Sequence, residues 1–379
     1  MWKNCLWELY RILNRHEKST VMKQLSVVIA AYNQETEIRR AVQSALGQDV
    51  PDLEVIVVND GSRDGTGAVL SEIAAADSRV RVITKENGGV SAARNDGIRA
   101  AAGRWLITLD GDDYFEPGIF RKLLQAAGEA EKADLVISGM FYDYPDRREE
   151  FEPEAEFDGD LRGFLGEQFI PLYDRHLLTT HCNKLYDLGI IRENGIYYKE
   201  DIAINEDIDF VFRYLGHCRK IRVIKAPCIH YVQHDAGKSQ ITTFREYGLS
   251  SSLTVLGDFF ALTEKLPANP EMAADEDNPA EAGTVPEGGA SDGAFEASLT
   301  GIYNRLLVHI LSFNGLMYRN SGYPDHRKLS ELRALMENAD FRRLLDLANP
   351  SDIKTSLALR ILRSGKVRIY HRLCRVLYR

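Results

Sequence analysis

Two aspartates, Asp110 and Asp112, stand one residue apart at the end of the apolar run "RWLITL". Carboxylates this close repel each other, but at the end of a buried strand both can converge on one cation. Mg²⁺ and Mn²⁺ prefer oxygen ligands and need only one or two carboxylates beside substrate phosphates. A solvated acidic turn ahead of a helix is the ordinary alternative for this motif. The neighbouring Asp113 is expected to cap the helix or to support the pair.

A second acidic turn follows an earlier apolar run, "LEVIVV", where Asn59, Asp60, Gly61 and Ser62 occur in succession. The carboxylate of Asp60 could accept hydrogen bonds from a nucleotide base or a ribose. The same residue types suit a helix N-cap, where Asp and Ser are common. The turn lacks the Gly-Lys-Ser/Thr ending of a Walker loop, and no Gly-x-Gly-x-x-Gly follows the first apolar run.

A pair of glycines then precedes a predicted helix in the stretch "KENGGVSAARNDGI". Gly88 and Gly89 let the backbone come close to a ligand, and the N-terminus of the following helix favours an anion. Arg94 lies one turn into that helix and could reach a phosphate. A simple turn is the alternative interpretation of the glycine pair.

The elements that must position these motifs follow a regular pattern. Amphipathic segments alternate with apolar runs of strand length, which lie at 25–32, 53–60, 80–84, 104–110 and 133–141. This pattern predicts an α/β fold with a mainly parallel sheet sandwiched by helices. Ligands of such sheets bind at the carboxyl ends of the strands, so we expect the three motifs to meet there.

The composition narrows the class of protein. A hydrophobic content of 44% and a charged content of 27% are ordinary for a globular domain, and a net charge of -9 argues against general nucleic-acid binding. The five cysteines show no pairing pattern, which indicates free thiols in a reducing compartment. Since no apolar run approaches the roughly 18 residues of a membrane-spanning helix, we expect a cytoplasmic protein.

The order and spacing of the motifs resemble those of the family 2 glycosyltransferases, in particular the bacterial surface-polysaccharide type. The resemblance implies the GT-A fold, a Rossmann-like and mainly parallel sheet sandwiched by helices, here with a helical C-terminal extension. It runs from about residue 25 to 242 and does not extend over 250–379. The matching stretches are "SVVIAAYNQE", "VIVVNDGSRDGT", "NGGVSAARNDGI", "GRWLITLDGDD" and "CNKLY…INEDIDFVFRYL".

The resemblance implies a donor site, residue by residue. The positions of Tyr32 and Glu35 line the nucleotide pocket, and that of Asp60 holds the edge of the base. Lys184 matches a region near the donor sugar and the acceptor. The residues assigned to the nucleotide-sugar are Ala31, Tyr32, Glu35, Asp60, Gly88, Gly89, Arg94, Asp110 and Lys184.

The resemblance also implies which residues hold the metal ion and which residue is the catalytic base. Asp112, with Asp110, would hold the Mn²⁺ or Mg²⁺ that bridges the diphosphate. Asp207, in "NEDIDF", matches the catalytic base, with Glu206 beside it. A charged cap on the helix that follows is the alternative for these two carboxylates.

One segment departs from the family pattern. In "CIHYVQHDAGKSQIT", Val232 stands where many relatives have an arginine. His234 is therefore a candidate ligand for the metal or diphosphate, with His230 a weaker one. Lys238 could also supply the missing positive charge.

The expected domains are an amphipathic N-terminal segment, a glycosyltransferase domain, a connecting helix, an acidic disordered insertion and a helical C-terminal region. The insertion carries eight acidic residues and no Lys or Arg, so it can bury little apolar surface. Within the domain we expect a nucleotide-binding half and an acceptor half. The respective bounds are 1–22, 23–245 (halves 23–142 and 143–245), 246–267, 268–297 and 298–379.

The end of the chain is basic. Residues 354–379 carry eight Lys or Arg and no acidic residue, and Ile369, Leu373, Val376 and Leu377 fall on one helical face. Such a helix suits an anionic membrane surface, here the inner face of the cell membrane. Packing against the rest of the protein is the alternative.

The expected activity is inverting, metal-assisted transfer of a hexosyl or N-acetylhexosaminyl group. The donor would be a nucleotide-diphosphate sugar, with a UDP-sugar expected, and the acceptor a hydroxyl of a glycan or a lipid-linked oligosaccharide. One alternative is a sugar nucleotidyltransferase, which would need a Gly-rich loop where this chain has "AAYNQE". Another is a non-catalytic sugar-nucleotide-binding scaffold protein.

Overall fold

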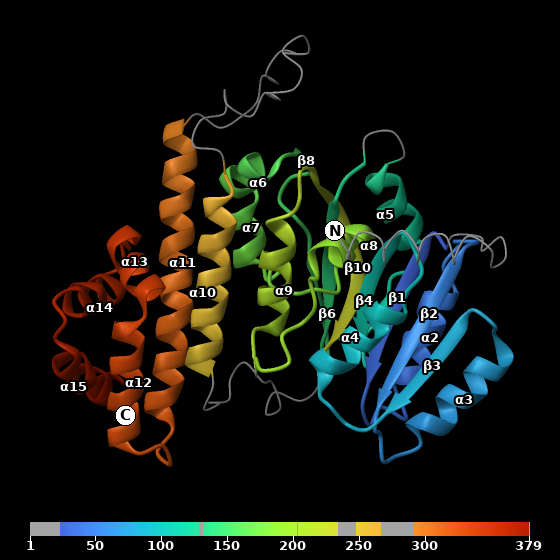
Figure 1. Cartoon of the computed structure of the whole chain (residues 1–379), viewed down its shortest axis with the longest axis horizontal. Coiled ribbons are helices and arrows are strands. Elements are labelled where there is room, and N and C mark those ends of the chain that lie inside the picture. The colour runs from blue at the N-terminus through green and yellow to red at the C-terminus, as the bar shows by residue number, and fades with distance from the viewer. Residues whose placement is uncertain (1–22, 129–131, 203, 234–247, 267–291, 379) are drawn as a thin grey trace, which may run out of the picture.

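The computed structural model describes residues 23–128, 132–202, 204–233, 248–266 and 292–378 (Figure 1). The predicted segment 1–22, most of the predicted acidic insertion and the candidate ligand His234 lie outside the described residues.

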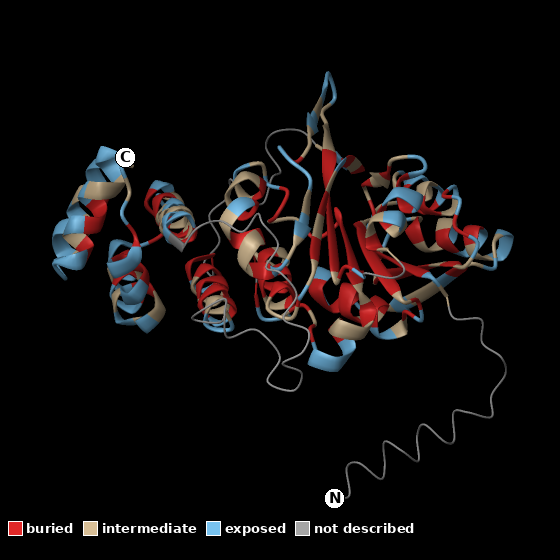
Figure 2. Cartoon of the chain, turned by 90° about the horizontal axis from the view of Figure 1, so that it is seen from above, coloured by how far each residue is buried: buried red, intermediate tan, exposed pale blue. Residues whose placement is uncertain are grey.

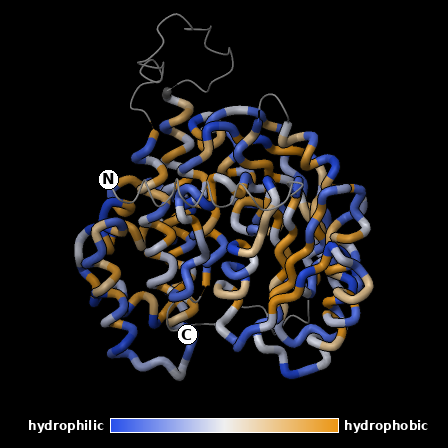
Figure 3. Tube along the Cα trace, turned by 45° about the vertical axis from the view of Figure 1, so that its right-hand side comes forward, coloured by the Kyte–Doolittle hydropathy of each residue, from blue (hydrophilic) through white to orange (hydrophobic). Residues whose placement is uncertain are grey.

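Four parallel strands form the half of the sheet that contains the N-terminal strand. They lie in the order β3-β2-β1-β4, so β1 sits between two neighbours. Every residue of β1 is buried, because helices cover both faces of the sheet. A parallel strand that is buried on both faces has an almost continuous apolar sequence (Figure 3). Their bounds are β1 Leu25–Ala31, β2 Leu53–Asp60, β3 Val80–Lys85 and β4 Trp105–Asp110.

The other half of the sheet is mixed. Strands β6 (Leu135–Asp143) and β10 (Ile221–Val232) are parallel, but β9 (Lys184–Asp187) runs antiparallel between β4 and β6. The sequence analysis did not predict β9, because its four residues are too few to show a strand pattern. Shorter strands complete the sheet: β5 Tyr114–Phe115, β7 Arg148–Phe151 and β8 Phe157–Gly159.

The first helices alternate with these strands, as the sequence pattern predicts. Helix α2 begins at Ile38, because Glu35 is held outside the helix by hydrogen bonds to the loop after β2. Helix α5 begins after Gly118, whose φ of 73° breaks the helical path behind Pro117. The bounds are α2 Ile38–Leu46, α3 Thr66–Ala76, α4 Val90–Ala100 and α5 Ile119–Ala127.

Helix α4 packs very close to β1. A methyl group at Gly97 would lie 2.3 Å from Val28 Cγ1, so only glycine permits this separation. Seven residues of α4 are buried, among them Arg94. The close packing carries this charged side chain into the interior beside the central strands.

The helices of the second half lead into a separate helical layer. Helix α10 packs against α9 and against the long helix α11, and α12 to α15 follow beyond it (Figure 1). Helix α11 begins at Asp292 rather than at the predicted 298, so the end of the predicted insertion is helical. The bounds are α6 Leu161–Glu167, α7 Phe169–Asp174, α8 Leu188–Asn194, α9 Glu206–Leu215, α10 Gly248–Glu264, α11 Asp292–Arg319, α12 Asp325–Glu337, α13 Ala339–Leu347, α14 Ile353–Arg363 and α15 Val367–Leu377.

Burial is continuous through the sheet and the inner helix faces, and the last helices turn exposed faces outward (Figure 2). Among the described residues, no helix combines the length and apolar character needed to cross a bilayer.

Candidate functional site

The predicted motifs meet at the carboxyl ends of β1, β2 and β4. In the strand register Ala31 pairs with Asn59, and Ala30 pairs with Asp110. Because β2 and β4 flank β1 on opposite sides, this edge is a point where ligands of open α/β sheets bind. Tyr32 is 44% exposed there, whereas Ala31 is buried in the strand.

Asp60 organises the loop in front of α4. Its two carboxylate oxygens accept hydrogen bonds from the backbone N–H groups of Gly88 and Gly89, at 2.8 Å each. Gly89 has a φ of 89°, which favours glycine. The anion at this helix N-terminus is therefore the carboxylate of Asp60 itself, and its contact with a base stays a prediction.

Glu35 joins the loop after β1 to the loop after β2. Its carboxylate accepts a hydrogen bond from Gly65 N at 2.9 Å, and its own N–H donates to Asp64 Oδ2 at 3.2 Å. The loop that carries Tyr32 is thus fixed against the turn that follows Asp60.

Arg94 is the centre of the site. Its guanidinium Nη2 lies 2.7 Å from Asp110 Oδ1, and Nη1 lies 2.8 Å from Asp207 Oδ1 and 3.3 Å from Glu206 Oε1. The residue is 3% exposed, and its guanidinium carbon lies 5.2 Å from the centre of the Tyr198 ring. Both Nη atoms bind carboxylates, and the contact of Arg94 with a phosphate stays a prediction.

These ion pairs determine which side chains of the site are ionised. Burial alone would lower the pKa of Arg94, but the charges of Asp110 and Asp207 raise it well above its usual value. Burial likewise opposes ionisation of Asp110, yet the nearby charge of Arg94 holds the pKa of Asp110 well below its usual range. For Glu206, burial and the charge of Asp207 raise the pKa to about 7.

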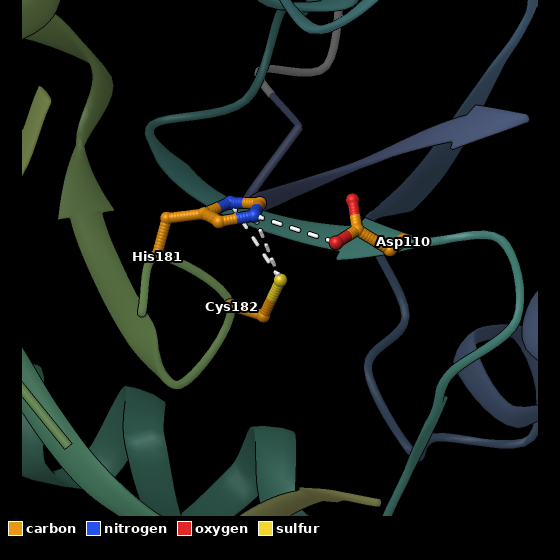
Figure 4. A group of neighbouring side chains, drawn as sticks. All are labelled: Asp110, His181 and Cys182. Carbon is orange, nitrogen blue, oxygen red and sulfur yellow. Dashed lines mark hydrogen bonds and ion pairs between the residues drawn. The ribbon is translucent and has the colours of Figure 1, made fainter. Parts of the chain in front are cut away.

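The antiparallel strand β9 brings two further residues to the same place. Because Leu106 of β4 pairs with Tyr186 of β9, the residues just before β9 lie beside the carboxyl end of β4. His181 Nε2 is 3.8 Å from Asp110 Oδ2 and 3.6 Å from Asp207 Oδ1. Figure 4 shows His181 and Cys182 directed toward Asp110.

Sequence reasoning missed His181 and Cys182, although Cys182 is the first residue of the "CNKLY" motif that it used and His181 directly precedes it. The signal that could have found them is a histidine and a cysteine side by side within a family motif. Their relation to Asp110 depends on β9, which the apolar pattern did not reveal.

Lys184 is placed differently from its predicted role. It is fully buried, and its Nζ donates to Leu177 O and Asn183 Oδ1 at 2.7 Å each, and also to Thr180 O. Burial lowers the pKa of this amine to about 7. The side chain holds the loop before β9 together, and its predicted contact with the donor sugar has no support here.

The Asp-x-Asp loop has a fixed shape. Gly111 N donates to Ala30 O at 3.0 Å, and a Cβ on Gly111 would lie 2.0 Å from Gln34 Oε1. Arg40 Nη2 donates to the backbone oxygen of Asp112 at 2.8 Å. Asp110 and Asp112 are each half-buried, and their oxygens are the hard donors that Mn²⁺ or Mg²⁺ prefers, so the residues fit the expected ion.

The neighbouring polar residues support the fold. Asp113 is buried and accepts a hydrogen bond from Val232 N at 2.8 Å, so it joins the loop to β10. His230 is 2% exposed, lies 2.7 Å from Glu116 and stacks on Tyr114 at 4.2 Å between ring centres. Both ring nitrogens of this histidine contact carboxylates inside the protein, and its contact with a metal or diphosphate stays a prediction.

A hollow of about 500 Å³ lies elsewhere, and none of the predicted site residues lines it. Its walls are acidic and basic side chains of the second half, with Glu150, Glu152, Glu154, Arg175 and Lys225 among them. The candidate site is therefore identified by its chemistry and not by cavity volume.

Known proteins share both the sequence motifs and the fold. Residues 26–194 match the family described as Glycosyl transferase family 2. EpsJ and EpsH of Bacillus subtilis, both named as glycosyltransferases, are 31% identical over 201 residues and 32% identical over 227 residues. These matches cover 53% and 55% of this chain but only 58% and 61% of the relatives.

A solved structure extends the comparison to the helical region. TarS 1-349 of S. aureus in complex with UDP matches 94% of this chain and 91% of its own, with a TM-score of 0.65 and 18% identity. The two proteins share the α/β sheet and the C-terminal helices. Residues 26–194 therefore resemble glycosyl transferase family 2 in sequence, and the chain has the GT-A fold that it shares with TarS.

Proposed function

We propose that this protein is an inverting, metal-assisted glycosyltransferase that transfers a sugar from a nucleotide-diphosphate sugar to a hydroxyl of a glycan or lipid-linked acceptor. The observation that carries the proposal is the joining of Asp110 and Asp207 by Arg94. One guanidinium thereby fixes a donor-side carboxylate and the candidate base at a defined separation.

The donor would bind at the carboxyl ends of β1, β2 and β4. The exposed ring of Tyr32 offers a flat apolar surface for a base, next to the loop fixed by Asp60. TarS, which shares the fold, has been crystallised with UDP and with UDP-GlcNAc, in agreement with a UDP-sugar donor. Asp110 and Asp112 would hold Mn²⁺ or Mg²⁺, which neutralises the charge that develops on a leaving diphosphate.

Asp207 is the candidate base. An attacking hydroxyl must lose its proton as it approaches the anomeric carbon, and a positioned carboxylate can accept it. The Asp207 side chain is 27% exposed, while its Oδ1 is held by Arg94. The carboxylate is thus anchored on one side and accessible on the other. Attack from the face opposite the diphosphate inverts the configuration.

The alternatives fit less well. A sugar nucleotidyltransferase needs a Gly-rich loop directly after β1, where this chain has Tyr32 followed by the bracing residue Glu35. A binding scaffold has no need of a base, yet Glu206 and Asp207 converge on the same arginine as Asp110.

We further propose that α15 contacts an anionic membrane surface. The helix packs on the protein through Tyr370, whose hydroxyl accepts a hydrogen bond from Asn314 at 3.1 Å, and through buried Cys374. The opposite side exposes Ile369 (49%) and Val376 (73%). Packing against the protein and binding to a membrane are therefore compatible. One face of α15 packs inward, while an apolar face flanked by arginines remains exposed and could bind lipid.

The variant Asp207→Asn tests the base. Asparagine keeps an oxygen that can accept from Arg94, so nucleotide binding should persist while transfer falls by about 10²- to 10⁴-fold. The measurement is UDP release from a panel of UDP-sugars with Mn²⁺, together with UDP affinity by calorimetry. Asp146→Asn, at a largely exposed position paired with Arg147, is the control and should behave as wild type. Normal transfer by Asp207→Asn would show that the base is another residue.

The variant Glu206→Gln tests the crowding of carboxylates around Arg94. Because the folded-state pKa of about 7 lies above the ordinary 4.5, the folded state binds this proton more tightly between these values. The stabilisation of the folded state by this proton is complete below about pH 4.5 and is lost as the pH rises through about 7.

Replacement of Glu206 by glutamine removes this dependence of the unfolding free energy on pH. From pH 5 to pH 8, the unfolding free energy of Glu206→Gln should rise relative to wild type by on the order of 1–3 kcal/mol. Urea denaturation of the metal-free protein across that range measures the difference. A difference that stays constant with pH would contradict the assigned environment.

Charge reversal tests the membrane contact. Arg368→Glu/Arg372→Glu should abolish salt-sensitive sedimentation with vesicles of anionic lipid, because attraction near such a surface amounts to about 1 kcal/mol per basic residue. Arg81→Glu/Lys122→Glu, which reverses two exposed charges in the other half of the protein, should leave sedimentation unchanged. Equal loss in both variants would mean that only net charge matters, and no binding by wild type would end the proposal.

A further inference from the structure

We propose that Asp110, His181 and Cys182 form a second metal site, beside Asp207, which takes a soft divalent ion such as Zn²⁺. This site shares only Asp110 with the pair that fits Mn²⁺ or Mg²⁺. Its ligand atoms are already gathered, since those of Asp110, His181 and Cys182 all lie within 4.8 Å of one another (Figure 4).

The separations suit a tetrahedral ion. His181 Nε2 lies 3.2 Å from Cys182 Sγ, 3.8 Å from Asp110 Oδ2 and 3.6 Å from Asp207 Oδ1. Zinc bonds of about 2.0–2.3 Å place neighbouring ligand atoms about 3.3–3.8 Å apart in a tetrahedron. These three distances from His181 Nε2 lie within about 0.1 Å of that range. Cys182 Sγ is also 3.6 Å from His181 Nδ1, so it lies against the face of the ring and must turn toward the Nε2 side to bind the same ion.

Two of the ligands are oriented by partners outside the site. The Nδ1 atom of His181 lies 2.6 Å from Thr108 Oγ1, and we assign Nδ1 as the donor, which leaves the lone pair of Nε2 for a metal. Asp110 binds Arg94 through Oδ1, and its Oδ2 is the oxygen nearest to His181. Such outer partners are typical of metal-binding histidines and carboxylates.

The donor set and its burial select the ion. A thiolate and an imidazole favour Zn²⁺ over Mg²⁺ or Mn²⁺. His181 and Cys182 are 1% and 2% exposed, whereas Asp110 and Asp207 are partly exposed and provide the entry side. As the Zn–S bond forms, the thiol proton of Cys182 passes to solvent.

Local charge also favours a dication. The carboxylates of Asp110, Glu206 and Asp207 surround the single positive charge of Arg94. A Cys182 thiolate would add a further negative charge beside them. A divalent ion bound here would reduce the excess of negative charge that Arg94 alone leaves.

The consequence for activity rests on the proposed function. An ion bound by Asp110 and His181 would lie beside Asp207, the carboxylate that accepts the acceptor proton. Zn²⁺ should therefore inhibit transfer in a way that excess Mn²⁺ does not fully reverse, because the two ions prefer different donors.

The test is a Co²⁺ titration of the chelator-treated full chain, followed by displacement with Zn²⁺. A cobalt–thiolate bond gives a near-ultraviolet charge-transfer band, and tetrahedral Co²⁺ gives visible bands. We expect both in wild type, loss of the thiolate band in Cys182→Ser, and at least tenfold weaker Zn²⁺ binding in Cys182→Ser and His181→Asn. Cys218→Ser, a change at another buried cysteine, should leave the spectrum unchanged.

Crystals of wild type soaked in Zn²⁺ make the result independent of whether the variants fold. An anomalous peak between Asp110 and His181 supports the site, whereas a peak only at Asp112 or none at all overturns it. An unchanged cobalt–thiolate band in a folded Cys182→Ser variant also overturns it. If Zn²⁺ binds as expected but does not inhibit, the metal site stands and the role of Asp207 as base fails.

Discussion

The structure depends on the placement of one buried positive charge. Arg94 is 3% exposed and lies at the meeting point of α4, the end of β4 and the start of α9. Removing a guanidinium from water is costly unless its partners are close and well oriented. Helix α4, which carries Arg94, is thus held in one arrangement with β4 and α9, which supply its partners, and movement of any of the three would leave a charge unpaired.

This arrangement explains how distant parts of the chain share one site. Gly97 lets α4 approach β1 closely enough to bury Arg94. The N-terminus of α9 favours the acidic residues of its first turn, and two of these, Glu206 and Asp207, pair with the arginine. Donor-side and acceptor-side carboxylates, 97 residues apart in sequence at Asp110 and Asp207, are therefore positioned by the same side chain.

The sequence predicted the parallel half of the sheet, its covering helices and the convergence of Asp60, Asp110 and Asp112, because apolar periodicity and strand-end motifs are local signals. It did not predict what depends on packing across the sheet. The antiparallel strand β9 is too short to show in a pattern, so the proximity of His181 to Asp110 was missed and Lys184 was assigned to the donor. The carboxylate partners of Arg94 were also not predicted, since nothing local in the sequence shows them.

A double-mutant cycle between Arg94→Met and Asp207→Asn, measured by urea denaturation of the metal-free protein at pH 8, tests the central claim most directly. If one guanidinium holds the candidate base, the two changes should be coupled by about 1–3 kcal/mol, because each removes the same ion pair. The corresponding cycle with Asp110→Asn should show a coupling of similar size. Additivity within about 0.3–0.5 kcal/mol, as for independent sites, would contradict the account.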